Sequence, residues 1–281
     1  MDTINDSILV PVDFSDQSLI ALKQSYNIAR LVNAQIILLH VLTGQLSKDN
    51  ESGFNTELDS LTDKLNELSR DVTEESGVRC GFYIEHGRIV PSILQTAKNI
   101  NANFIFIGTR KMTIGPITMR IIKEAPCPVV SIKGKYHRRG CQRIVLPLDL
   151  TKTTTQKMHI TMKLAKYFKS RVQVVSASTP TKEFKLTKLR MLLEQVRDYF
   201  VGHDIQCSTK LLDTGNKPDD IANALLDYAD DVQGDLIVIM IQQENPLKEK
   251  LLGSLARKII MGSNIPVLCV KPSFTKTPKR K

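Results

Sequence analysis

A short apolar stretch that occurs twice constrains this chain more than any other feature of its sequence. The first copy is residues 8–15 (ILVPVDFS) and the second is residues 144–151 (IVLPLDLT). Each copy is rich in β-branched residues, lacks polar alternation and leads into an acidic residue, Asp13 or Asp149. Such a run predicts a strand covered on both faces, as in a parallel sheet between helices. The acid then follows the carboxyl end of the strand, where open α/β sheets bind ligands.

The residues after each copy predict the same order of helices and strands. Ser15 is the expected cap of the first helix. Further strands are expected over 34–42, 78–85, 104–107, 128–132, 171–177, 205–212, 235–239 and 266–270. Helices are expected over 16–32, 54–75, 116–124, 152–168, 182–201 and 247–261, with others near Pro91 and Pro218. Strands alternating with helices predict right-handed crossovers, and so two tandem α/β domains with five-stranded parallel sheets.

We place the domain boundaries by this repeat and by charge. The first domain spans 1–135 and the second spans 144–272, with a basic linker at 136–143 and a basic tail at 273–281. The net charge of +10 is concentrated in the linker and tail, while residues 1–135 are close to neutral. Basic ends without interleaved aromatic residues are typical of solvated segments, so we expect no nucleic-acid partner.

Composition argues against several other classes of protein. No apolar run reaches the roughly 18 residues of a membrane span, and the first residues lack the pattern of a secretory signal. The five cysteines are scattered without a Cys-x-x-Cys pair. A disulfide framework or zinc site is therefore not expected, and we expect a protein of the reducing cytoplasm.

The spacing between matching residues locates a deletion. Asp13 and Asp149 are 136 positions apart, whereas Phe104 and Leu236 are 132 apart and Pro128 and Pro266 are 138 apart. The first repeat has therefore lost about six residues from the loop that follows its fourth strand.

Several motifs together resemble the universal stress proteins in their tandem, two-domain form. They are residues 10–15 (VPVDFS), 86–87 (HG), 106–110 (FIGTR), 125–129 (APCPV), 146–149 (LPLD), 235–238 (DLIV) and 252–256 (LGSLA). The resemblance implies a Rossmann-like, adenine nucleotide α-hydrolase-like fold. In nucleotide-binding members, Gly-x2-Gly-x9-Gly-Ser/Thr after strand four holds ATP, and the acid after strand one lies near the ribose or a metal ion.

The first phosphate loop departs from the family pattern. Gly108 is present, but Lys111 occupies the second glycine position and the spacer is shortened. Gly115 is followed by Pro116, which has neither an N–H nor a hydroxyl group for a phosphate. We therefore predict that the first repeat does not bind ATP.

The second loop departs differently. Gly253 and Ser254 are retained, but Met240 and Gln243 replace the earlier glycines, and Glu244 adds a negative charge. The retained pair can place a helix N-terminus and a hydroxyl against an anion. The second repeat is therefore the expected site for a nucleotide or other anion.

The candidate ligand-binding residues come from both repeats, with the second preferred. They are Asp149, Gly253, Ser254, Asp13, Gly108 and Gly115. The implied ligand is ATP or another adenine nucleotide with Mg²⁺, and no protein-held metal is expected. The alternative roles are structural: each aspartate orders a turn, Ser254 caps a helix, and His40 and His86 stabilise the fold.

No catalytic constellation is evident, because the His-x-Gly-His and Ser-Gly-Gly-x-Asp-Ser signatures of related folds are missing. We expect a non-catalytic stress-response protein that acts by binding a ligand and protein partners. The alternatives are an ATP-binding protein with slow ATPase activity and a ligand-free interaction scaffold. The two repeats are expected to pair through their fifth strands as an intramolecular pseudo-dimer, and a homodimer is left open.

Overall fold

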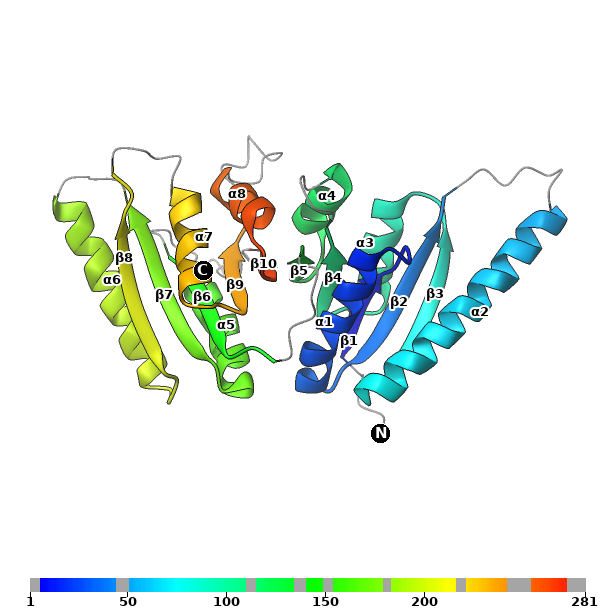
Figure 1. Ribbon diagram of the computed structural model, residues 1–281, viewed down its shortest axis with the longest axis horizontal. Helices are drawn as coiled ribbons and strands as arrows, with labels where there is room; N and C mark the ends of the chain where they lie inside the picture. Colours follow the sequence, from blue (N-terminus) through cyan, green and yellow to red (C-terminus); the bar gives the residue numbers. More distant parts are fainter. Residues whose placement is uncertain are drawn as a thin grey trace, which may run out of the picture. The chain divides into compact units, whose positions relative to one another are not determined.

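The chain forms two compact units that divide between Gln142 and Arg143, except that residues 263–268 group with the first unit (Figure 1). The computed structural model describes residues 6–43, 51–109, 115–133, 140–148, 154–178, 183–215, 221–241 and 254–271. Residues 136–139 of the predicted linker and the whole predicted tail lie outside these residues. Two predicted helix starts, at Pro218 and at residue 247, also lie outside them.

The first unit alternates strands with helices along the chain. Its elements are β1 (Ser7–Pro11), α1 (Asp16–Val32), β2 (Gln35–Leu42), α2 (Glu51–Ser76), β3 (Cys80–His86), α3 (Ile89–Asn99), β4 (Phe104–Gly108), α4 (Pro116–Glu124) and β5 (Val129–Ile132). The strands form a parallel sheet in the order β3-β2-β1-β4-β5. The order reverses between β1 and β4, which makes their carboxyl ends a topological switch point.

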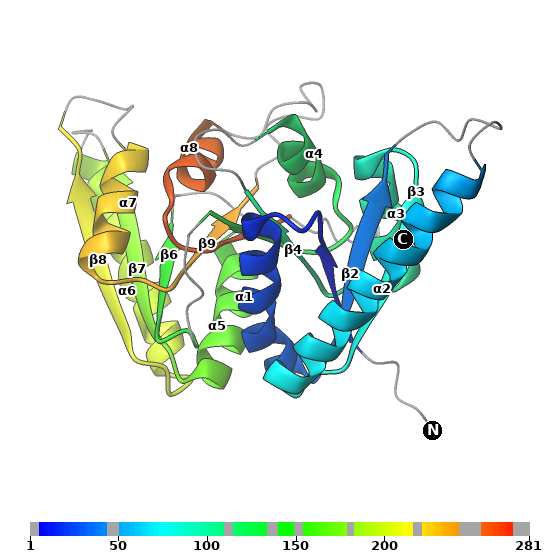
Figure 2. The ribbon, with the colours of Figure 1, turned by 45° about the vertical axis from the view of Figure 1, so that its right-hand side comes forward.

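The central strands are apolar because helices cover the sheet. Ile8, Leu9 and Val10 of β1 have no exposed surface. Figure 2 shows α1 and α2 on the near side of the strands, and α3 packs against α4. The uninterrupted apolar run of β1 is thus explained by burial on both faces.

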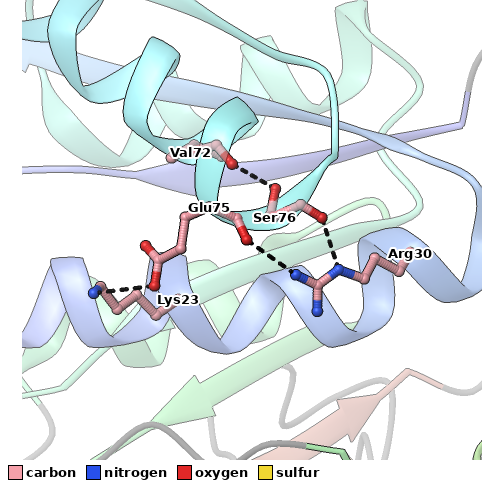
Figure 3. A network of polar contacts seen from close by, with 5 residues as sticks. All are labelled: Lys23, Arg30, Val72, Glu75 and Ser76. Carbon is pink, nitrogen blue, oxygen red and sulfur yellow. Dashed lines mark hydrogen bonds and ion pairs between the residues drawn. The ribbon is translucent and has the colours of Figure 1, made fainter.

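A polar network ties the end of α2 to α1 (Figure 3). The Arg30 Nε–H donates to the carbonyl oxygen of Ser76 at 2.8 Å, and a second guanidinium nitrogen lies 3.5 Å from the Glu75 carbonyl oxygen. Lys23 forms an exposed ion pair with the Glu75 carboxylate at 3.4 Å. Since the last carbonyls of a helix lack partners within the helix, Arg30 supplies a cap from a neighbouring element.

The second unit repeats this order. Its elements are β6 (Arg143–Pro147), α5 (Thr154–Phe168), β7 (Arg171–Ser178), α6 (Glu183–Val201), β8 (Cys207–Asp213), α7 (Ile221–Asp231), β9 (Leu236–Met240), α8 (Ser254–Gly262) and β10 (Val267–Val270). The strand order is β10-β9-β6-β7-β8, with parallel pairing of β6 to β7 and β9, and of β7 to β8. The predicted fold class, a tandem of parallel α/β sheets, is confirmed.

Matching backbone hydrogen bonds fix which residues are equivalent in the two units. The Val12 N–H donates to the Leu39 carbonyl oxygen at 2.9 Å, and in the second unit the Leu148 N–H donates to that of Val175 at 2.8 Å. Likewise the Thr109 N–H donates to the Ile132 carbonyl oxygen at 2.7 Å, and the Ile241 N–H donates to that of Val270 at 2.8 Å. In the first pair of bonds, both donor and acceptor are 136 positions apart in the sequence. In the second pair, the donors Thr109 and Ile241 are 132 positions apart. The offsets found in the sequence therefore describe structural equivalence.

Candidate functional site

A tight turn follows β1 and presents Asp13. Ser15 is the N-cap of α1, and its hydroxyl accepts from the Ser18 N–H at 3.4 Å. The Asp13 carboxylate accepts from both the N–H and the hydroxyl of Ser15, at 3.1 and 2.5 Å. Asp13 therefore orders the turn, as its structural alternative predicted, while its side chain stays exposed to solvent.

The residue between the aspartate and the cap adopts an uncommon backbone conformation. Phe14 has a φ of 58°, in the left-handed region that costs a bulky residue about 1–3 kcal/mol. Its ring lies 5.5 Å from that of His40, centroid to centroid. This contact and the Asp13–Ser15 hydrogen bonds hold the strained turn in place.

A cavity of about 550 Å³ opens at the carboxyl ends of β1 and β4. Its walls combine the turn after β1, the ends of β2 and β4 and the starts of α1, α3 and α4. The lining residues are Pro11, Val12, Asp13, Ser15, Gln17, Ser18, Leu39, His40, Val41, Ile89, Ile93, Ile107, Gly108, Gly115, Ile117 and Thr118. The structure thus brings together the three candidates of the first repeat, Asp13, Gly108 and Gly115, at the switch point.

Gly108 is required by packing at this point. A Cβ atom there would lie 2.3 Å from the carbonyl oxygen of Gln17 and 2.9 Å from the nitrogen of Ser18. Only glycine lets the end of β4 approach the first turn of α1 this closely. Gly108 therefore shapes the cavity by letting two elements meet.

Gly115 has a different environment. It is the N-cap of α4 without a side-chain cap, and a Cβ atom there would meet nothing within 4 Å. Pro116 follows at the first helical position, where it has no N–H to offer. Ile117, the next residue of α4, lines the cavity, so an apolar residue stands at the start of the helix that the resemblance places against a phosphate.

His40 serves both the fold and the cavity. Its Nδ1 lies 2.8 Å from the carbonyl oxygen of Val12, and a carbonyl only accepts, so Nδ1 carries the proton. In the neutral ring Nε2 is then an acceptor. Ser176, the equivalent residue of the second unit, donates its hydroxyl to the Leu148 carbonyl oxygen at 2.9 Å. The shared contact supports the predicted structural role, while the ring also lines the cavity.

The candidates of the second repeat are not described in the same detail. Asp149 and Gly253 lie outside the described residues, and so do Lys111, Gln243 and Glu244 of the two loops. Ser254 begins α8, but its side chain is not among those described. The preference for the second repeat stays a prediction from the sequence.

The described residues offer no protein-held metal site. Among them, no three His, Cys, Asp or Glu side chains gather in a way that could hold an ion. The Asp13 carboxylate is engaged by Ser15 in the turn. A Mg²⁺ ion at this site would therefore depend on a ligand for most of its oxygen contacts. None of the described helices has the length and apolar character needed to cross a bilayer.

The structure is an α/β protein with a tandem repeat and a cavity at the switch point of its first unit. The chain belongs to the universal stress protein family, whose model matches residues 5–133 and 212–271, more than half of the chain. Universal stress protein MJ0531 of Methanocaldococcus jannaschii is 27% identical over 143 residues, covering 47% of this chain and 84% of that protein. Universal stress protein Sll1654 of Synechocystis is 24% identical over 132 residues, covering 45% of this chain and 84% of that protein.

A solved structure reproduces the fold over nearly the whole chain. The universal stress protein from Archaeoglobus fulgidus DSM 4304 superposes with a TM-score of 0.78 at 17% sequence identity, covering 95% of this chain and 98% of that chain. At this identity the similarity establishes the fold.

Proposed function

We propose that this protein is a non-catalytic stress-response protein that binds an adenine nucleoside, or the nucleoside part of a nucleotide, in the cavity of its first repeat. The observation that carries the proposal is the cavity itself, which lies at the β1–β4 switch point where α/β sheets bind nucleotides. Its volume of about 550 Å³ is within the range of small-molecule sites. The proposal thus favours the first repeat, whereas the sequence favoured the second and predicted no ATP binding in the first.

The walls of the cavity suit a flat ring joined to a sugar. Pro11, Val41 and Ile89 line the cavity and are partly exposed, so they offer apolar surface against which a base can pack. Asp13 presents a carboxylate as an acceptor, and the His40 ring, whose Nδ1 contacts the Val12 carbonyl oxygen, also lines the cavity. Ribose hydroxyls and the exocyclic amine of adenine are donors, so they match this arrangement.

The phosphate end is poorly provided. The first turn of α4 has lost one N–H to Pro116 and has no side-chain cap at Gly115. The Asp13 carboxylate also repels phosphate oxygens that approach it. We therefore expect the phosphates of ATP to add little to the binding free energy.

Calorimetric titration with adenosine, AMP and ATP with Mg²⁺ tests this proposal. We expect saturable binding of adenosine with an affinity within about tenfold of that for ATP, a difference of about 1.4 kcal/mol. The ligands dAMP and cAMP, named in structures of other universal stress proteins, complete the series. Failure of all five ligands to bind would reject the nucleoside site and favour the scaffold alternative.

Two variants separate the sugar end from the phosphate end. Asp13→Asn keeps the side-chain shape but removes the charge, and should weaken adenosine binding about tenfold. Pro116→Ser writes into the first repeat the Gly-Ser pair that the second repeat carries. It restores one N–H and one hydroxyl, so it should strengthen ATP binding about tenfold and leave adenosine unchanged. An equal effect of Pro116→Ser on both ligands would contradict the assignment of α4 to the phosphate end.

Action through protein partners and a cytoplasmic location remain parts of this proposal. The family places the chain among stress proteins, and the net charge of +10 supplies a simple check. Nucleic-acid binding driven by the basic segments would fall steeply with salt and on removal of the tail. We expect no retention of DNA or RNA at physiological ionic strength, in agreement with a role in protein contacts.

A further inference from the structure

A buried lysine stands at the second unit's switch point. Lys157 of α5 is only 5% exposed, and its Nζ donates to the carbonyl oxygen of Pro147 at 3.0 Å. Lysine is almost never buried to this extent without a specific reason. At the offset of 136 its equivalent in the first unit is Ala21, which is fully buried. The second unit has therefore placed a long cationic side chain where the first has a methyl group.

The Lys157 ammonium lies where the cavity of the first unit is found. Its partner Pro147 is the last residue of β6 and corresponds to Pro11, which lines the cavity. The first strand of each unit pairs with the fourth at only two positions in its first half. Beyond these positions the two strands separate. The ammonium group thus enters the crevice between the ends of β6 and β9.

A second substitution lies beside the same crevice. Met240 ends β9 at the position of Gly108, and its side chain is 6% exposed. Gly108 is one of the residues that line the cavity of the first unit. In that unit a Cβ atom at this position would already collide with α1, so the buried Met240 side chain requires the end of β9 to lie further from the start of α5.

Equivalent residues around the crevice are more buried in the second unit than in the first. In the first unit Pro11, His40 and Gly108 are all partly exposed. Their equivalents in the second unit are all buried. These are Pro147, Ser176 and Met240. Because three matched positions change in the same direction, the difference belongs to the crevice as a whole.

We infer that Lys157 and Met240 close the ligand crevice of the second repeat to small molecules. The ammonium satisfies the carbonyl at the end of β6, and the methionine adds a buried side chain where the first repeat has none. Lys157 and Met240 are thus the residues that determine which repeat accepts a ligand. The nature of that ligand rests on the proposed function.

The stoichiometry of adenosine binding tests this inference. Wild-type protein should bind one equivalent, and the double variant Lys157→Ala/Met240→Gly, which writes the residues of the first repeat into the second, should bind two. Lys157→Met is the matched control. It removes the charge but keeps most of the volume, so it should still bind one equivalent.

The outcomes separate the inference from the proposed function. A double variant that is folded by circular dichroism yet gains no equivalent over wild type overturns the inference. Two equivalents for the wild type also overturn it. No binding by the wild type together with one equivalent for the double variant supports the inference and rejects the site in the first repeat. Should the double variant not fold, Lys157→Ala alone is titrated. One equivalent gained over wild type then supports closure, and none contradicts it.

Discussion

Replacing Gly108 with alanine separates two roles that a glycine can have in a ligand-binding loop. A glycine that only lets phosphate approach the backbone can be replaced without loss of stability, whereas one that lets two elements meet cannot. The added Cβ atom would lie 2.3 Å from the oxygen, 2.5 Å from the carbonyl carbon of Gln17 and 2.9 Å from the Ser18 nitrogen. All three are backbone atoms of α1, so no side-chain rotation relieves the overlap.

The size of the overlap sets the expected loss of stability. Ordinary carbon contacts begin at about 3.5 Å, so α1 and β4 must separate by roughly 1 Å. Overpacking of this kind costs about 1–3 kcal/mol, and we expect about 3 kcal/mol here because the opposing atoms are backbone. The same shift moves the Ser15 cap and the turn that presents Asp13, so ligand binding should fall together with stability.

Urea unfolding followed by circular dichroism measures this change, with Gly115→Ala as the matched control. Gly115 has a φ of −61° and open space at its Cβ position, so its variant should stay within about 0.5 kcal/mol of wild type. The packing explanation of Gly108 would be refuted by equal free energies of unfolding for the two variants.

Two further predictions concern stability elsewhere in the first unit. Burial raises the pKa of the Cys80 thiol to about 11, above its ordinary value of about 8.5. The folded protein then holds this proton more tightly, so the thiol's contribution to the free energy of unfolding is complete below about pH 8.5 and is lost as the pH rises toward about 11. Cys80→Ala should therefore reduce the fall of the urea midpoint at alkaline pH. An unchanged fall would contradict this prediction. Arg30→Ala removes the guanidinium from the end of α2 and should cost about 1–2 kcal/mol of stability. Lys23→Ala should cost less than about 0.5 kcal/mol, because its ion pair is exposed. Thermal melts compare the two variants, and equal shifts of the melting temperature would count against Arg30 as a helix cap.

The periodicity of the sequence was sufficient to predict the architecture. The helix 16–32 and the helix 116–124 were predicted at the bounds that the structure shows, and most strands differ by one or two residues. These elements are specified locally, since Ser15 caps the first helix and Pro116 opens the other. The start of α2 is less regular: the sequence predicted residue 54, whereas the described helix begins at Glu51. The predicted start of α5 at residue 152 lies outside the described residues.

The site was predicted only in part, because its important contacts join residues far apart in the chain. The sequence named Asp13, Gly108 and Gly115 as candidates, and the structure brings them to one cavity. The sequence suggested a phosphate contact for Gly108. Its packing role could not be predicted, because the close approach of Gln17 depends on how α1 lies against β4. The contact of His40 with Val12 likewise requires β1 and β2 to be in register.

Lys157 is the residue that the sequence reading missed. A signal for it was present, because the offset of 136 places this lysine opposite Ala21 within an otherwise buried helix face. Its significance depends on the contact between Nζ and the Pro147 carbonyl oxygen, which only the structure provides. Met240 was recognised as a replaced glycine, but its burial at the end of β9 could not be inferred from the replacement alone.

Methyl NMR on protein labelled at isoleucine tests the central claim most directly. Ile107 lines the cavity of the first repeat, and Ile239 is its equivalent in the second at the offset of 132. Adenosine should shift the δ1-methyl resonances of Ile107 and of the other cavity residues Ile89, Ile93 and Ile117, and leave Ile239 unchanged. A shift of Ile239 with Ile107 unmoved would show that the ligand binds in the second repeat and would contradict the account.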